Sequence, residues 1–171
     1  MVNLRHALRP STHDRPTRTY RMIVPVSGGS GDKRLLEIVS KISNKQNVAI
    51  TIVFVVEVEQ SMPLDAELPA EIERGERVLR DAEIFADSCV HGRQGSVHTE
   101  LLQARSAGSA IVDEAIDRDA DVIMLSAGLR RKHGKVTTGE TVDYVMKNAP
   151  CEVVVIRLAQ PDWQSEMLVP E

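Results

Sequence analysis

The chain has 171 residues, of which 42% are hydrophobic and 27% are charged, and its formal net charge is −4. This length and composition predict one globular domain with a hydrophobic core. No apolar run reaches the roughly 18 to 20 residues of a membrane-spanning helix, and arginines interrupt the N-terminus where a signal peptide would be apolar. We therefore expect a cytoplasmic protein that does not insert into a membrane. The negative charge and the 3% aromatic content argue against nucleic-acid binding.

The two ends of the chain differ from its centre. Residues 1–21 carry five arginines and one aspartate, a charge of +4, which leaves −8 for the other 150 residues. With its prolines and few apolar residues, the segment 1–19 is predicted to be a flexible basic lead-in. An alternative is a linker that follows a membrane span, because basic residues favour the cytoplasmic side. The segment 159–171 is predicted to be a loose tail, so one domain covers residues 20–158.

Strand and helix patterns alternate between these ends. Short apolar or β-branched runs predict strands, and apolar residues at helical spacing predict helices. The predicted strands are 20–26, 48–58, 97–103, 121–126 and 152–157. The predicted helices start near Asp32 and near Ala70, and two more cover 106–118 and 138–148. The third strand is the most polar, which favours a place at a sheet edge.

This βαβαβαβαβ order predicts a parallel α/β sheet with helices on both faces, of the Rossmann-like or flavodoxin-like kind. Ligands of such sheets bind at the carboxyl ends of the strands, where the strand order reverses. The basic, glycine-containing loop after the strand 121–126 is therefore the first place to look for function.

Three runs resemble a universal stress protein domain over residues 20–158: MIVPVSGGSGDKRLLEIV, FVVEV, and DVIMLSAG followed by GETVDYVMKNAPCEVVVIR. The resemblance implies a five-stranded parallel sheet of the adenine nucleotide alpha hydrolase-like type. It also implies an adenine nucleotide (ATP, AMP or a cyclic form) held between the first and fourth strands. It further implies a homodimer formed through the last strand, Glu152 to Arg157. Such pairing would cover an apolar strand edge that otherwise templates aggregation.

The resemblance also implies which residues would contact the nucleotide. They are Pro25, Ser27, Gly28, Val55, Leu125, Ser126, Gly128, Arg130, Thr138, Gly139, Glu140 and Thr141. The family motif is GxxG, nine residues, then glycine and a hydroxyl residue. Aligned on Gly139, this chain has Ser126 and Leu129 at the first two glycines and Glu140 at the hydroxyl position. Ser27 stands where nucleotide-binding members usually carry an aspartate.

Glu140 allows two interpretations. A carboxylate at a helix start would repel a triphosphate. Alternatively, Thr137 and Glu140 fit the TxxE capping box, in which the glutamate caps its own helix. The basic residues at 130–132 and 135 either bind phosphate through their side chains or form a solvated loop.

Two functions are compatible with these patterns. One is a non-catalytic, stress-responsive binding domain that senses an adenine nucleotide. The alternative is a cytoplasmic regulatory domain of an amino-acid or cation transporter that does not bind ATP. The histidines have no metal-ligand spacing and no nucleophile beside them, so we expect neither a metal nor an enzyme activity. The two cysteines lie far apart and are predicted to be free thiols.

Overall fold

The computed structural model describes residues 19–43, 47–89, 96–128, 130–132, 135–137 and 139–157. The C-terminal tail and all of the basic lead-in except its last residue lie outside these residues, as do Leu129 and Thr138. The strands are β1 (Tyr20–Pro25), β2 (Val48–Glu57), β3 (Ser96–Ala104), β4 (Val122–Ala127), β5 (Arg130–Lys132), β6 (Lys135–Thr137) and β7 (Glu152–Arg157). The helices are α1 (Ser30–Ser43), α2 (Pro69–Cys89), α3 (Ala107–Asp117) and α4 (Glu140–Asn148).

Five strands form one all-parallel sheet in the order β3-β2-β1-β4-β7. The predicted α/β fold is therefore confirmed, and the polar third strand lies at an edge. Strand order runs outward from β1 through β2 to β3, and then returns across β1 to β4. The switch point of the sheet is therefore between β1 and β4.

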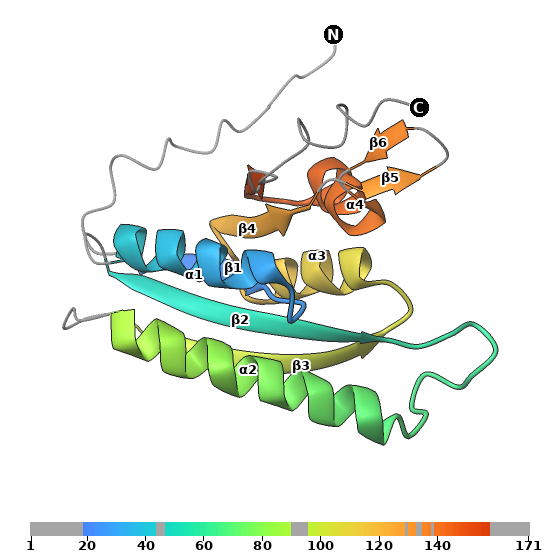
Figure 1. The fold of residues 1–171 in the computed structure, drawn as a ribbon. Coiled ribbons are helices and arrows are strands. Elements are labelled where there is room, and N and C mark those ends of the chain that lie inside the picture. Colours follow the sequence, from blue (N-terminus) through green and yellow to red (C-terminus); the bar gives the residue numbers. More distant parts are fainter. Residues whose placement is uncertain are drawn as a thin grey trace, which may run out of the picture.

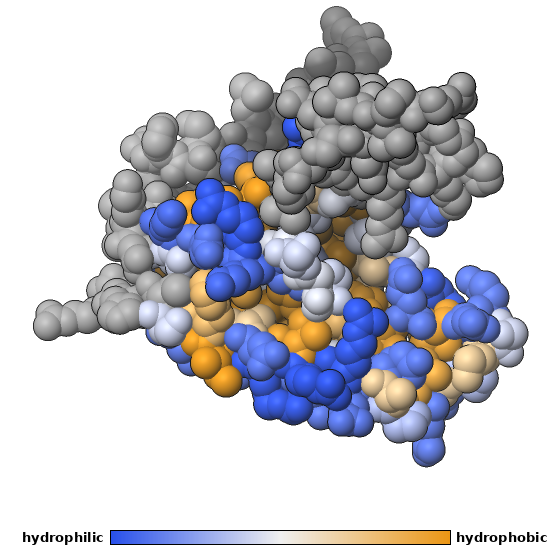
Figure 2. Space-filling model, in the orientation of Figure 1, coloured by the Kyte–Doolittle hydropathy of each residue, from blue (hydrophilic) through white to orange (hydrophobic). Residues whose placement is uncertain are grey.

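Helices cover both faces of the sheet, as Figure 1 shows. One face packs against α1 and α2 through a core that includes Leu35 and Leu79. The other packs against α3 and α4 through a core that includes Ile111 and Val145. Because both faces are covered, β2 is apolar along nearly its whole length, and Val48, Ile52 and Val53 are each 0% exposed. The outer surface of α2 is mainly hydrophilic (Figure 2), although Ile84 is exposed on it.

Three local features differ from the sequence-based prediction. The basic loop contains an antiparallel two-stranded ladder, β5 with β6, which extends from the end of β4 (Figure 1). Helix α1 begins at Ser30 rather than near Asp32. The last strand residue of β4 is Ala127 rather than Ser126. Among the residues that the structure describes, no helix combines the length and apolarity that a membrane span requires.

Candidate functional site at the carboxyl edge of the sheet

The switch point brings together the carboxyl ends of β1 and β4. Strand β1 ends at Pro25, and the chain continues through Ser27 and Gly28 into α1. Strand β4 leads through Ser126 to Gly128, which is exposed. The predicted site residues of the first and fourth strands therefore meet at one edge of the sheet.

Pro25 separates these two strands at that edge. The β1·β4 ladder pairs only Met22 with Val122 and Ile23 with Ile123, although both strands continue beyond these pairs. Successive residues of a parallel strand bond to opposite neighbours. The Val26 amide donates to the Val53 carbonyl of β2 (2.9 Å), so the backbone polar groups of residue 25 face β4 instead. Residue 25 is a proline, which has no amide hydrogen to donate to β4. The proline therefore removes the next rung of the ladder and leaves polar backbone of β4 available at the switch point.

The strand residues of the predicted site divide between the two faces of the sheet. Val55 and Leu125 pack with the core beneath α3 and α4, and Leu125 is 4% exposed. Pro25 alternates with Ile23 and so lies on the same face. Ser126 alternates with Leu125 and lies on the α1 side. Pro25, Val55 and Leu125 thus form an apolar set, and Ser126 is not part of it.

The loop between β1 and α1 is closed by Asp32, a residue that the sequence analysis did not single out. Its Oδ2 atom accepts hydrogen bonds from the amides of Ser27 (2.8 Å), Gly28 (2.7 Å) and Gly29 (3.2 Å). Asp32 as a residue is 9% exposed. Burial raises the pKa of the Asp32 carboxyl above its usual value, while the three amides act in the opposite direction. An acidic residue in the third position of a helix can cap the helix start, and that signal was present in the sequence.

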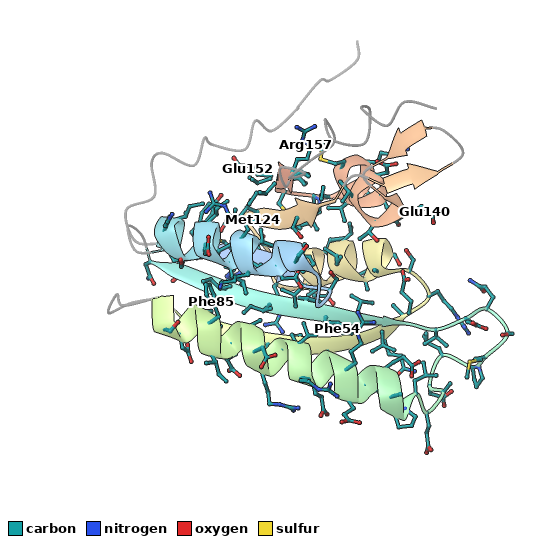
Figure 3. All side chains as sticks on the ribbon, viewed as in Figure 1. Phe54, Phe85, Met124, Glu140, Glu152 and Arg157 are labelled. Atoms are coloured by element: carbon teal, nitrogen blue, oxygen red, sulfur yellow. The ribbon has the colours of Figure 1, made fainter. Side chains whose placement is uncertain are left out.

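Helix α2 braces this loop from the other side. Arg74 donates from Nη2 to the Ser27 carbonyl oxygen (3.0 Å). Gly28 has φ +78°, and a Cβ atom there would lie 2.9 Å from Val78 Cγ2. Gly75 allows α2 to approach the sheet, because a Cβ on it would lie 2.7 Å from the ring of Phe54. Figure 3 shows Phe54 between β2 and α2. These contacts join residues far apart in sequence, so no local pattern predicted them.

The amino end of α3 is also engaged by a carboxylate of the same chain. Glu57, the last residue of β2, accepts a hydrogen bond from the Ala107 amide (2.7 Å) through Oε1. Arg105 donates to the carbonyl oxygens of Val58 and Glu59. The carboxyl ends of β2 and β3 are therefore tied to each other around the start of α3.

The predicted capping box of Thr137 and Glu140 at the start of α4 is wrong. Thr137 is the last residue of β6 and pairs with Arg130, so it is not at the helix start. Gly139 is the N-cap, with φ 99° and ψ 155°, a conformation that favours glycine. Glu140 is the first helical residue and is exposed, and Thr141 is half-buried. Figure 3 shows Glu140 at the rim of the molecule.

Arg130, the remaining predicted contact, begins the β5–β6 hairpin. The register pairs Arg130 with Thr137, Arg131 with Val136, and Lys132 with Lys135. The hairpin therefore concentrates four basic residues on six described positions next to β4. Among the residues that the structure describes, no group of three or more His, Cys, Asp or Glu side chains is placed to hold a metal ion.

Strand β7 forms the second edge of the sheet. Val153 and Val155 pack against the α3/α4 core, whereas Ile156 packs on the opposite core. Val154 is 41% exposed. Glu152 and Arg157 bound the strand (Figure 3). An apolar strand with one unpaired side thus lies at the surface of the described chain.

The sequence profile of the universal stress protein family matches residues 19–157, which covers every element of the fold. The chain belongs to the universal stress protein family. No curated protein matches this universal stress protein.

Solved structures support the same fold. The universal stress protein UspA from Lactobacillus plantarum is 23% identical, with a TM-score of 0.66 over 82% of this chain and 99% of that one. The protein from Archaeoglobus fulgidus in complex with dAMP is 18% identical, with a TM-score of 0.61 over 80% and 97%. A family member from Arabidopsis thaliana with AMP bound is 14% identical, with a TM-score of 0.52 over 82% and 92%.

Proposed function

We propose that this universal stress protein is a non-catalytic domain that binds an adenine nucleotide at the carboxyl edge of its sheet, between β1 and β4. The observation that carries the proposal is the early end of the β1·β4 ladder at Pro25, which opens the switch point between two central strands. Two relatives of the same fold are in complex with dAMP and AMP. The half-buried Pro25 and Val55 offer an apolar surface for a base, and Ser126 and Gly128 offer polar backbone beside it.

Gly128 gives a direct way to block the site. It is exposed, its φ is not positive, and a Cβ added to it meets no described atom within 4 Å. Gly128→Leu should therefore fold normally while placing a bulky side chain at the switch point. Ala70→Leu, at an exposed position near the start of α2, is the matched control.

The test is calorimetric titration and thermal unfolding with AMP, ADP, ATP and cyclic AMP. A ligand at one hundred times its dissociation constant stabilises the folded state by about 2.7 kcal/mol. We expect the wild type and Ala70→Leu to bind at least one of these nucleotides, and Gly128→Leu to bind it at least tenfold more weakly. Chromatography of the incubated nucleotide should show no product. Absence of binding by the wild type, or equal binding by Gly128→Leu, would refute the proposed site.

We also propose that the protein forms a homodimer through β7. A two-fold axis perpendicular to the sheet makes β7 antiparallel to its copy and preserves the face of each residue. A register centred on Val155 pairs Val154 with Ile156 of the second copy, which covers the exposed Val154 side chain and leaves Glu152 outside the apolar contact. Pairing also satisfies the backbone groups of the edge strand.

The dimer is tested by Val154→Arg. The substitution places a charge in the centre of the proposed contact, where an unpaired buried charge is unfavourable. The control is Ile84→Arg, because Ile84 is an exposed apolar residue on α2, 69% exposed and remote from β7. Light scattering after gel filtration should give a dimer for the wild type and Ile84→Arg, and a monomer for Val154→Arg. A wild-type monomer at high micromolar concentration would refute the proposal.

A further inference from the structure

Strand β3 forms the edge of the sheet opposite β7, and none of its nine residues is buried. The Ala104 carbonyl of β3 accepts a hydrogen bond from the Val58 amide (2.8 Å), so the backbone groups of residue 104 face the β2 side. Because successive residues of a parallel strand bond to opposite neighbours, the backbone groups of alternate residues face away from β2: Val97, Thr99, Leu101 and Gln103. No strand of the described chain pairs with these groups, so the edge can accept a further strand.

The sequence of β3 contains little that would prevent such an addition. Edge strands are commonly kept short or protected by proline, lysine or a bulge. Strand β3 has neither proline nor lysine, and its pairing with β2 is continuous over nine residues. The other edge, β7, has six residues and is the strand through which we propose the homodimer. A cover on β3 would therefore leave one open edge and limit assembly to a closed dimer.

The side of α2 that borders the open edge is acidic. Helix α2 lies along β3 (Figure 1), and a Cβ atom on Gly75 would lie 2.9 Å from Leu101 Cδ1. Val78 packs against the loop between β1 and α1. With 3.6 residues per turn, Glu83 and Asp87 lie on the opposite side of the helix from Val78, toward the open edge. Neither forms an ion pair with another described residue.

The other face of β3 also carries a net negative charge. Glu100 lies on the face that α3 covers, and Arg118 pairs with both Glu100 and Glu114, so two carboxylates share one guanidinium. Leu102 lies on the same face and is half-buried. A strand with basic side chains toward α2 and apolar side chains toward Leu102 would complement this edge.

The chain itself contains a segment of that composition, outside the described residues. Residues 2–9 read VNLRHALR, in which Leu4 and Leu8 each precede an arginine, Arg5 and Arg9. Side chains of a strand point alternately to opposite faces. The two arginines would therefore share one face of an added strand, and the two leucines would share the other.

The rest of the lead-in is long enough to bring this segment to β3. Eight residues of strand extend for about 27 Å, close to the length of β3. Strand β1 begins at Tyr20, two strands from β3, which corresponds to about 10 Å across the sheet. Residues 10–19 can span about 33 Å, and both prolines of the lead-in lie in this connection. By the shortest route, a segment that ends beside the start of β1 runs antiparallel to β3.

We propose that residues 2–9 add to the free edge of β3 as an antiparallel strand of the same chain. Arg5 and Arg9 then lie beside Glu83 and Asp87 of α2, and the added backbone bonds to the outward groups of β3. The added strand protects β3 from pairing with other chains and leaves β7 as the open edge. This interaction does not depend on nucleotide binding.

The test is amide hydrogen exchange of the ¹⁵N-labelled full chain, followed by NMR. In the wild type, the outward amides of β3 should exchange at least tenfold more slowly than in Arg5→Glu/Arg9→Glu. The control Arg15→Glu/Arg18→Glu makes the same charge change in the connecting segment and should keep the wild-type rates. The β3 amides that bond to β2 should stay protected in every variant, which would show that the sheet is folded.

Charge reversal on α2 tests the contact itself. Glu83→Arg/Asp87→Arg should speed up exchange of the outward β3 amides, and combining it with Arg5→Glu/Arg9→Glu should restore their protection. Equal exchange of these amides in the wild type and Arg5→Glu/Arg9→Glu would overturn the proposal. So would protection that disappears on about tenfold dilution, because the added strand would then come from another copy of the chain.

Discussion

Gly139 and Gly128 flank the segment between β4 and α4, and together they test how α4 starts. A Cβ atom at either glycine would meet no described heavy atom within 4 Å, so an alanine there creates no steric overlap with those residues. The two differ in backbone conformation. Gly139 has φ 99°, whereas Gly128 does not have a positive φ. Alanine substitution at the two positions therefore isolates the conformational cost.

The expected effects have opposite signs. An alanine at a position with φ 99° and ψ 155° adopts a region that side chains rarely occupy, at a cost of about 1–3 kcal/mol. An alanine at a compatible glycine position instead stabilises by about 0.4–1 kcal/mol, because it restricts the unfolded chain. We expect Gly139→Ala to be less stable than Gly128→Ala by about 1.4–4 kcal/mol.

Urea unfolding followed by circular dichroism measures this difference. The slope of free energy against urea should be the same for both variants, because neither changes the surface exposed on unfolding. The unfolding temperatures should differ by roughly 3–16 °C, since about 2–4 °C corresponds to 1 kcal/mol in a domain of this size. Equal midpoints would refute the N-cap conformation that we assign to Gly139.

Three further predictions concern the scaffold. Burial and the neighbouring Glu152 carboxylate raise the pKa of Tyr20 to about 12. The contribution of Tyr20 to stability is therefore present below pH 10.0 and is lost as the pH rises through about 12. In urea titrations between these two pH values, the unfolding free energy of the wild type should fall more steeply with pH than that of Tyr20→Phe. Gly75→Ala would place a Cβ 2.7 Å from the Phe54 ring. The cost of overpacking, about 1–3 kcal/mol, should exceed the gain of about 1 kcal/mol in helix propensity, so the urea midpoint should fall. The second substitution Phe54→Leu should partly restore that midpoint. Arg118→Ala removes the ion pairs with Glu114 and with Glu100 of β3. The unfolding free energy measured in urea should fall by about 1 kcal/mol, and this loss should shrink in high salt. A loss that is independent of salt would contradict an electrostatic role.

The sheet could be predicted because its strands carry their signal locally. The run of β-branched residues in β2 reflects burial on both faces, and the more polar β3 reflects its place at an edge. Right-handed crossovers then leave few possible topologies, and the resemblance to universal stress proteins pointed to the place between the first and fourth strands. Pro25 was assigned to the site by resemblance, and the structure adds the reason that a proline matters there, which is the missing rung toward β4.

The details of the site depend on contacts that no local pattern contains. Strands β5 and β6 have three residues each and are mostly charged. Runs this short contain no recognisable alternation of apolar and polar residues, so the sequence does not distinguish a hairpin from a basic loop. Thr137 fits a capping-box spacing, but its pairing with Arg130 places it in a strand, and Gly139 becomes the N-cap. Arg74 and Glu57 act across 47 and 50 residues of sequence, respectively.

The central claim is that an adenine nucleotide binds where β1 and β4 separate at their carboxyl ends. The most direct measurement is a titration of the ¹⁵N-labelled protein with AMP, followed by amide chemical shifts. We expect saturable shifts at Ser27, Gly28, Ser126 and Gly128, with little change at the opposite edge of the sheet, where Asp121 lies. Saturable shifts confined to that opposite edge, or no shifts at millimolar AMP, would contradict the account.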